Sequence, residues 1–392
     1  MTIAPSLPFA RPDLDETEIA GVADVLRSGW IASGPWVQQF ERKLSDCCEG
    51  RPVRVVTSAT AAIEIALQIA GVVPGDEVIT CAQTFFTVLN MIARAGARPV
   101  FVDCELVTRN LDLAATEAAI TSRTKAIVPT HWPGSMTNLD GLLALAKRHG
   151  LRVIEDAALV QGSRYKGRPI GGFGDLCTFS FHPNKNMTTI EGGAIVVNDQ
   201  AEAARVEQLR FHGIVRLADG TRDIEHPSGK FNLPDVNARL GVGQLARLPD
   251  FLAARHALVE RYFERFDSDP RCLLPPRPLP DDGFSWNMFC VLLPLSELGV
   301  DRKAVRDELQ VRGIGTGISY EALHLTTLGR RLGYREGQFP NAERIARETL
   351  TLPLFSAMRT VDVDRVCAVV ADVLAHSRRT GGAVRSSASS SP

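Results

Sequence analysis

A lysine in a polar loop is the first residue of this chain that could do covalent chemistry. Lys185 stands in the segment FSFHPNKNMTTIEGG (residues 179–193), with a serine five positions before it and a glycine pair soon after it. A lysine that is removed from water has a lowered pKa, so its amine can attack a carbonyl carbon and form an imine. Most loop lysines are solvated and have no such role, and only the surrounding residues favour chemistry here.

An aspartate follows a segment that has the composition of a buried strand. Asp156 lies in VIEDAALVQG (residues 153–162), directly after an apolar run. In this position a carboxylate can point from the edge of a sheet into a cleft and pair with a positive charge on a ligand. The alternative interpretation is a helix cap, and the sequence alone leaves both open.

Two further segments could bind an anion. Small residues in TSATAAIE (residues 57–64) predict a turn from a strand into a helix, where free amides and the helix dipole attract a phosphate. Small residues are also common at such turns for structural reasons, so this signal is weak by itself. The fourth segment, GKFNLPDVNARLG (residues 229–241), places Asn232 just before a predicted helix.

The elements that must position these residues alternate between short β-branched runs and longer amphipathic stretches. We expect a mostly parallel seven-stranded sheet of the α/β class, because apolar strands separated by helices are typical of a sheet covered on both faces. The carboxyl ends of parallel strands share one edge, where ligands bind. The expected strands are 53–58, 76–81, 98–103, 124–131 and 152–157, with two more within 177–181 and 192–199.

The pattern changes after residue 232. Residues 238–266 form one long amphipathic stretch, and the segments that follow it predict a smaller α+β unit. We therefore predict a large domain at 1–245 and a small C-terminal domain at 246–378. The last stretch, 379–392, is rich in serine and glycine and is predicted to be a disordered tail.

Composition excludes several classes of function. The chain has 392 residues and a formal net charge of −1, so no overall field attracts nucleic acid or an anionic membrane. It has no run of about 18 apolar residues and no signal peptide is visible. The eight cysteines are scattered without a C-x-x-C pair, so we expect free thiols in a reducing cytoplasm and no metal site.

Taken together, the four segments resemble a known family. In this order they are similar to the DegT/DnrJ/EryC1/StrS sugar aminotransferases, which are pyridoxal-phosphate (PLP) enzymes of fold type I, the aspartate-aminotransferase fold. The resemblance covers roughly residues 5 to 375. Within the family, the chain is most similar to the enzymes that aminate a UDP-4-keto-pentose for lipid A modification, through TSAT (57–60), LNMI (89–92), FHG (211–213), KFNLPD (230–235) and GIGTGI (313–318).

The resemblance implies a role for each matching residue. Lys185 corresponds to the lysine that holds PLP as a Schiff base, and Asp156 to the carboxylate that pairs with the pyridine nitrogen. Ala59 and Thr60, together with Ser180, correspond to the residues that hold the phosphate.

The remaining family positions surround the ring and the substrate. Phe85 corresponds to the aromatic residue that stacks on the pyridine, and Ala158 packs on the opposite face. Asn232 corresponds to a residue that reaches the phosphate from the neighbouring subunit, which implies a homodimer with shared active sites. The expected substrate contacts are Trp30, His131, Tyr320 and His324.

Three positions depart from the family pattern. Leu159 stands where relatives have a histidine or glutamine near the phenolic oxygen of the cofactor. Ser319 and Asn287 stand in the substrate region where a histidine is common. The cofactor site is thus nearly complete, whereas we expect the sugar site to differ from that of other members.

The resemblance predicts a PLP-dependent transaminase that moves an amino group from glutamate to a keto group of a nucleotide-linked sugar. Lys185 would serve both as covalent anchor and as acid and base. The expected pathway is the synthesis of surface polysaccharide, lipid A or a secondary metabolite. One alternative is a sugar dehydratase of the same fold, in which histidine replaces the lysine, so Lys185 argues against it. The other is a regulatory protein that binds PLP or a sugar without turnover, which only Leu159 favours.

Overall fold

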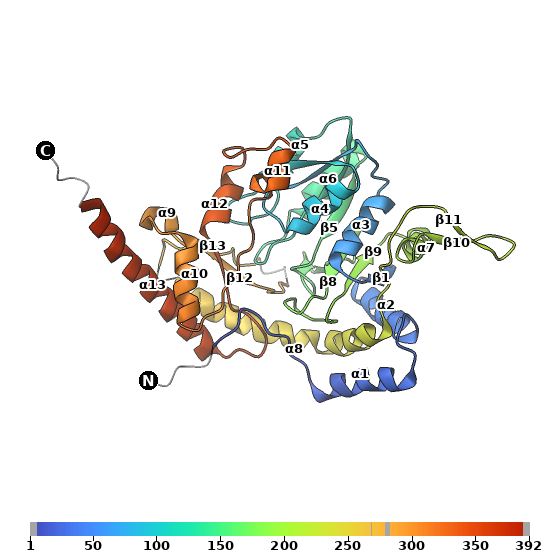
Figure 1. The fold of residues 1–392 in the computed structure, drawn as a ribbon, viewed down its shortest axis with the longest axis horizontal. Coiled ribbons are helices and arrows are strands. Elements are labelled where there is room, and N and C mark those ends of the chain that lie inside the picture. The colour runs from blue at the N-terminus through green and yellow to red at the C-terminus, as the bar shows by residue number, and fades with distance from the viewer. Residues whose placement is uncertain (1–5, 268, 279–282, 387–392) are drawn as a thin grey trace.

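The predicted sheet is present at the centre of the molecule (Figure 1). The computed structural model describes residues 6–267, 269–278 and 283–386. Seven strands form the sheet, and every neighbouring pair is parallel except the two that involve β9, which is antiparallel to both neighbours. Their order is β1 (Val53–Val56), β9 (Gly193–Val196), β8 (Leu176–Ser180), β5 (Arg152–Asp156), β4 (Thr124–Val128), β2 (Glu77–Cys81) and β3 (Arg98–Val102). The α/β fold and its mostly parallel sheet are confirmed.

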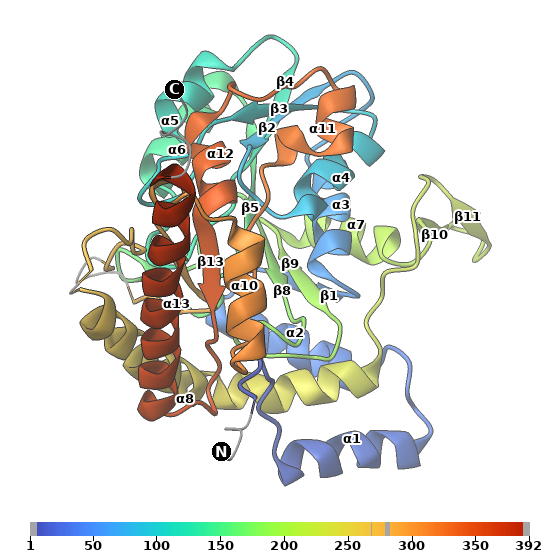
Figure 2. The same cartoon turned by 60° about the vertical axis from the view of Figure 1, so that its left-hand side comes forward.

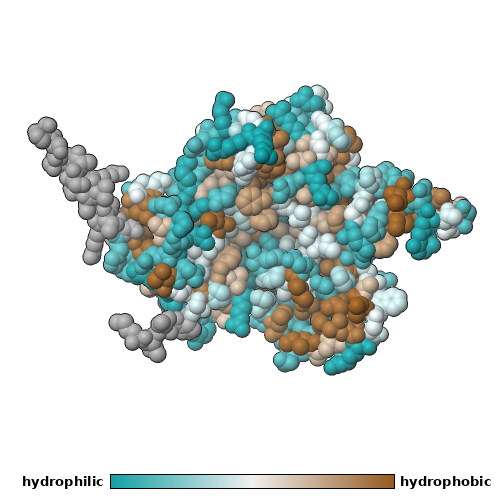
Figure 3. All heavy atoms as spheres, in the orientation of Figure 1, coloured by the Kyte–Doolittle hydropathy of each residue, from teal (hydrophilic) through white to brown (hydrophobic). Residues whose placement is uncertain are grey.

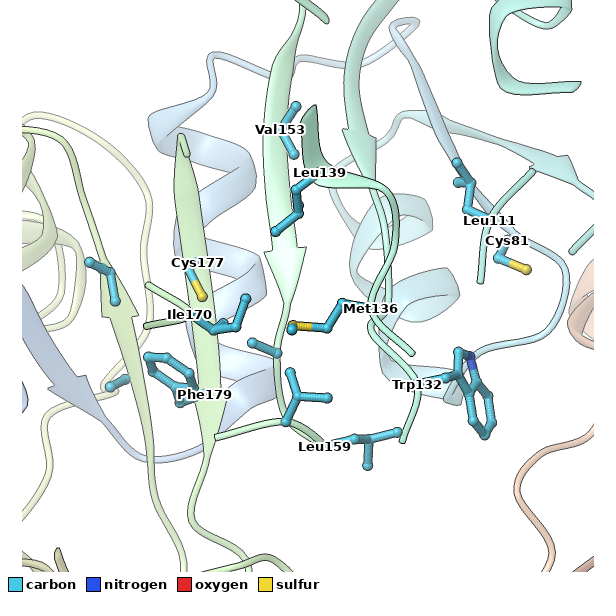
Figure 4. Close-up of a cluster of buried hydrophobic side chains, with 14 of the residues drawn as sticks. Cys81, Leu111, Trp132, Met136, Leu139, Val153, Leu159, Ile170, Cys177 and Phe179 are labelled. Carbon is cyan, nitrogen blue, oxygen red and sulfur yellow. The ribbon is translucent and has the colours of Figure 1, made fainter. Parts of the chain in front are cut away.

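Helices cover both faces of this sheet because its strands are apolar on both sides. On β5, Val153 packs into one hydrophobic cluster and its neighbour Ile154 into another, as expected when successive side chains point to opposite faces. Figure 4 shows part of the first cluster, including Val153, Leu139 and Leu159. The helices are α2 (Pro35–Cys47), α5 (Leu113–Ala118) and α6 (Leu139–His149) on the side of the first cluster, and α3 (Ala59–Ile69), α4 (Phe86–Arg94) and α7 (Gln200–Leu209) on the other.

One long helix joins the sheet to the C-terminal part of the chain. Helix α8 (Asp235–Phe266) packs against α1 (Glu16–Ser28) and α2 at one end and against α13 (Thr360–Ser386) at the other (Figure 2). The predicted boundary near residue 245 falls inside this helix, and the division into domains stays a prediction. Helix α13 continues to Ser386, and residues 387–392 of the predicted tail lie outside the described residues.

The C-terminal part has its own hydrophobic cluster, in which Phe263, Phe289 and Val366 are buried. It combines the antiparallel pair β12 (Phe289–Leu292) and β13 (Thr349–Leu352) with helices, as an α+β unit should. The remaining elements are α9 (Leu295–Leu298), α10 (Arg302–Val311), η1 (Leu323–Leu325), α11 (Thr327–Arg331), α12 (Pro340–Glu348) and the short pairs β6 (Arg164–Tyr165) with β7 (Arg168–Pro169) and β10 (Ile214–Arg216) with β11 (Arg222–Ile224). Across the described ranges, the helices are all too short or too polar to cross a membrane.

The start of α8 also caps another helix. The N-cap of α2 is Gly34, which has no side chain to offer. The buried carboxylate of Asp235 takes its place and accepts hydrogen bonds from the amides of Gly34 (2.8 Å), Val37 (2.9 Å) and Trp36 (3.2 Å). These amides have no acceptor within their own helix, so a residue about 200 positions away satisfies them.

Replacing this cap should weaken the fold. Asp235→Ala leaves three amides without an acceptor, and we expect the free energy of unfolding to fall by about 3 kcal/mol, as measured by urea denaturation. Asp24→Ala is the matched control, since Asp24 is exposed and its ion pair with Arg27 lies at the surface. Equal effects of the two substitutions would show that Asp235 does not cap α2.

Candidate active site

A cavity of about 210 Å³ opens at the carboxyl ends of β1, β5 and β8. It gathers residues from distant parts of the chain, as the predicted sheet edge requires. Of the residues expected at the cofactor and substrate, it brings together Ala59, Thr60, Phe85, Asp156, Ala158, Ser180, Lys185 and Tyr320.

The carboxylate of Asp156 lies at the buried side of this cavity. Its Oδ1 atom accepts a hydrogen bond from the amide of Ala158 (3.1 Å), and its Oδ2 atom accepts one from the hydroxyl of Thr130 (3.4 Å). Burial raises the pKa of Asp156, while these hydrogen bonds and the positive charge of Lys185 oppose the rise. Residues 157–162 form turns and no helix begins there, so the structure does not support the helix-cap interpretation.

Lys185 reaches the same cavity from the loop after β8. The amide of Lys185 donates to the carbonyl of His182 (2.9 Å), which closes a tight turn at this point. Burial lowers the pKa of the Lys185 amine to about 8, and the carboxylate of Asp156 opposes that shift. An appreciable fraction of the amine is therefore neutral near physiological pH, which is the form that attacks a carbonyl.

The turn from β1 into α3 forms the anion-binding end of the cavity. Ser58 is the N-cap of α3, and its hydroxyl accepts from the amide of Ala61 (3.1 Å). Ala59 and Thr60 occupy the first positions of the helix, where amides have no internal acceptor. A Cβ atom at Gly193 would lie 2.4 Å from the carbonyl carbon of Ser58, so only glycine allows β9 to approach this turn.

Phe85 and Ala158, the two residues expected on the faces of the cofactor ring, both line the cavity. Phe85 precedes α4, its side chain is 47% exposed, and its ring centroid lies 5.3 Å from that of Tyr320.

Leu159 also lines the cavity, but it belongs to the hydrophobic core and is 2% exposed. The nearby amide of Gln161 donates to the sulfur of Met187 (3.1 Å). The position of Leu159 therefore offers the cavity methyl groups and no hydrogen-bond donor.

Several expected site residues do not line the cavity. His131 and His324 are fully buried, and the Nε2 atom of each lies 3.0 Å from a glutamate, Glu155 and Glu343 respectively. These pairings hold both rings inside the protein, and neither ring lines the cavity. Trp30 is 61% exposed in the loop before α2.

Asn232 and two of the unusual positions also lie elsewhere. The side-chain amide of Asn232 donates to the hydroxyl of Ser33 (2.7 Å), and Asn232 does not line the cavity of its own chain. Ser319 is buried, and its hydroxyl accepts from Thr351 (2.8 Å). Asn287 donates to the carbonyl of Asn184 (2.8 Å). Both side chains thus make hydrogen bonds inside the protein, and the expectation that the sugar site differs from that of other members stays a prediction.

Sequence reasoning missed Thr130 and Thr87. Thr130 supports the carboxylate of Asp156, and Thr87 lines the cavity and donates to the hydroxyl of Thr60 (2.7 Å). Thr130 was detectable in principle, since it is a hydroxyl residue just after strand β4 at the same edge. Thr87 lies within the first turn of a helix and gives no comparable signal.

The residues at this cavity fit PLP. Free helix amides suit a phosphate, a buried carboxylate suits the protonated nitrogen of a pyridine, and a lysine with a lowered pKa suits an aldehyde. The cavity thus has a binding group for each of three parts of the cofactor: the phosphate, the ring nitrogen and the aldehyde.

Comparisons with known proteins agree with this fit. The model of the DegT/DnrJ/EryC1/StrS aminotransferase family matches residues 12–371. The spore coat polysaccharide biosynthesis protein SpsC of Bacillus subtilis is 38% identical over 382 residues, covering 94% of this chain and 97% of SpsC. The PLP form of the putative sugar aminotransferase Spr1654 from Streptococcus pneumoniae is 32% identical with a TM-score of 0.88, covering 95% of this chain and 99% of that one. Helicobacter pylori PseC, an aminotransferase involved in pseudoaminic acid biosynthesis, is 26% identical with a TM-score of 0.88 and covers 95% and 100%.

The lowered pKa of Lys185 can be measured directly. In protein stripped of cofactor, we expect the rate at which an amine reagent labels Lys185 to rise through a midpoint near pH 8. Lys303 is the internal control, because its ion pair with Asp307 raises its pKa. Asp156→Asn removes the negative charge that favours the protonated amine, so the Lys185 midpoint should fall by about half a unit or more. A midpoint near 10.5 would show that the amine is solvated.

Proposed function

Since the chain belongs to the DegT/DnrJ/EryC1/StrS aminotransferase family, whose members use PLP, we propose that it transfers an amino group from glutamate to a keto group of a nucleotide-linked sugar. The single observation that carries this proposal is the placement of Lys185 and Asp156 in one cavity. PLP, when bound, supplies a ring that withdraws electrons from the carbon bearing the amino group.

Lys185 has two proposed tasks. Its amine would hold the cofactor covalently, and the same amine would accept and release the proton that amino transfer requires. Both tasks need an amine that can lose and regain a proton near the working pH, and a pKa of about 8 allows this. The lysine is present at the position where dehydratases of this fold have a histidine, which favours amino transfer over that alternative.

The other cavity residues are proposed to hold and orient the cofactor. Burial raises the pKa of Asp156, so its carboxylate would be stabilised by a positively charged partner, and it would pair with the protonated ring nitrogen. Ala59, Thr60 and Ser180 bind the phosphate at the start of α3. Phe85 and Ala158, which both line the cavity, would pack on the two faces of the ring.

The names of the relatives and the sequence resemblance support the proposed substrate class. SpsC is named for polysaccharide biosynthesis, and Spr1654 is named as a sugar aminotransferase. We propose a UDP-linked 4-keto sugar as acceptor, in line with the sequence resemblance to the lipid A enzymes, and surface polysaccharide as the pathway. Of the four expected substrate residues, Tyr320 lines the cavity, and its ring packs against Phe85.

A second copy of the chain is proposed to complete the site. Asn232 lies outside the cavity of its own chain, and exposed apolar side chains gather on the same molecule over α1 and the loop after it (Figure 3). They include Ile19, Leu26, Trp30 and Ile31. A homodimer would cover this surface and could bring Asn232 to the phosphate of the neighbouring chain. The cytoplasmic location stays a prediction.

Loss of Lys185 should abolish the reaction without loss of the fold. We expect Lys185→Ala to reduce 2-oxoglutarate formation from glutamate and a panel of UDP- and dTDP-linked 4-keto sugars by at least about a thousandfold. Lys303→Ala, which changes an exposed lysine far from the cavity, should react at the wild-type rate. Near-normal transfer by Lys185→Ala would refute its role. Turnover of free keto sugars in place of the nucleotide-linked ones would refute the substrate class.

Mixed dimers can test whether the sites are shared. If Asn232 acts in the neighbouring site, Asn232→Ala alone should be impaired. Mixing it with Lys185→Ala should then restore one intact site in each mixed dimer. Activity that stays at the level of the two separate variants, with mixed dimers shown to form, would place Asn232 outside the neighbouring site.

A further inference from the structure

The loop that carries Lys185 is held by one face of helix α8. Asn237, Gln244 and Arg255 are spaced by 7 and 11 residues, and at about 100° per residue these spacings return within about 20° to the same side of a helix. The side-chain amide of Asn237 donates to the carbonyl of Thr189 (2.6 Å). The side-chain oxygen of Gln244 accepts from the backbone amide of Thr188 (3.1 Å). Arg255 approaches the carbonyl of Lys185 (3.5 Å).

Arg255 connects this loop to the C-terminal part of the chain. Its guanidinium is buried and is surrounded by backbone carbonyls, not by carboxylates. It donates to the carbonyls of Leu354 (2.8 Å) and Asn287 (3.1 Å). Burial lowers the pKa of Arg255 to about 10. A buried arginine of this kind is costly, and its planar group of donors is suited to holding several carbonyls in one fixed arrangement.

Asn287 makes the stronger contact with the loop. It is 4% exposed, it precedes β12, and its Nδ2 atom donates to the carbonyl of Asn184 at 2.8 Å. Asn287 and Arg255 therefore contact the carbonyls of two consecutive residues, the second of which is Lys185. Neither Asn287 nor Arg255 lines the cavity.

We propose that Asn287, together with Arg255, is a positioning residue for Lys185: by holding the carbonyls of residues 184 and 185, it fixes where the lysine side chain enters the cavity. The inference rests on the proposed function for the use made of Lys185, but the positioning itself is a property of the protein alone.

The physical consequence of losing this donor is specific. The carbonyl of Asn184, which is half-buried, would lose its side-chain donor, and the loop would shift until water replaced that donor. The amine of Lys185 would then be more hydrated, and hydration favours its charged form. A loss of general stability elsewhere in the protein would not produce this change in the amine.

The experiment compares three variants of the full chain. Asn287→Ala removes the donor, and Asn287→Leu removes it while keeping about the size of the side chain and adding no charge, so that a cavity is not the cause of any change. Ser285→Ala is the matched control. Ser285 is buried two residues away, and its hydroxyl contacts Ser163 (2.8 Å), not the lysine loop. The readouts are hydrogen exchange of residues 182–189 in the PLP-loaded protein and the pH midpoint of Lys185 labelling after cofactor removal.

In both Asn287 variants we expect loop exchange to be roughly two- to tenfold faster than in the wild type. The labelling midpoint should move upward from about 8, while Ser285→Ala leaves both readouts unchanged. Wild-type values in the Asn287 variants, or equal changes in Ser285→Ala, would overturn the proposal. A wild-type protein that transfers no amino group would refute the proposed function, yet both readouts would still decide whether Asn287 positions the loop.

Discussion

The attraction between the buried amine of Lys185 and the buried carboxylate of Asp156 is the interaction on which the site depends. Burial lowers the pKa of the lysine and raises that of the aspartate, and each charge opposes the shift of the other. The result is a lysine that can be neutral near physiological pH beside a carboxylate that favours a positively charged partner. These are the two electrostatic conditions that a PLP transaminase needs at opposite ends of the pyridine system.

The fold supplies this arrangement through the ends of its parallel strands. Strands β1, β5 and β8 end at one edge, so the start of α3, Asp156 and the lysine loop meet there although they are far apart in sequence. Helix α8 makes three further contacts that position these parts. It caps α2 with Asp235, contacts the lysine loop along one face, and reaches the C-terminal cluster with Phe263. One helix thus connects the large sheet, the lysine loop and the C-terminal part of the chain.

The sequence predicted the parts of this structure that local patterns encode. All seven strands were visible as apolar runs, because strands buried on both faces carry continuous hydrophobic side chains. Lys185 and Asp156 were recognisable because the loop and strand-end motifs around them are contiguous. The pairings of His131 with Glu155 and of His324 with Glu343 were not recognisable, since they join side chains 24 and 19 residues apart through the tertiary fold. The contact of Asn287 with Asn184, 103 residues apart, is of the same kind.

The covalent role of Lys185 is the central claim, and chemical trapping tests it most directly. The PLP-loaded protein is reduced with borohydride, digested, and analysed by mass spectrometry to locate the attached pyridoxyl group. The account predicts this group on the peptide that contains Lys185, and its disappearance when the protein is incubated with glutamate before reduction. A pyridoxyl group on another lysine, or a Lys185 adduct that glutamate does not remove, would contradict it.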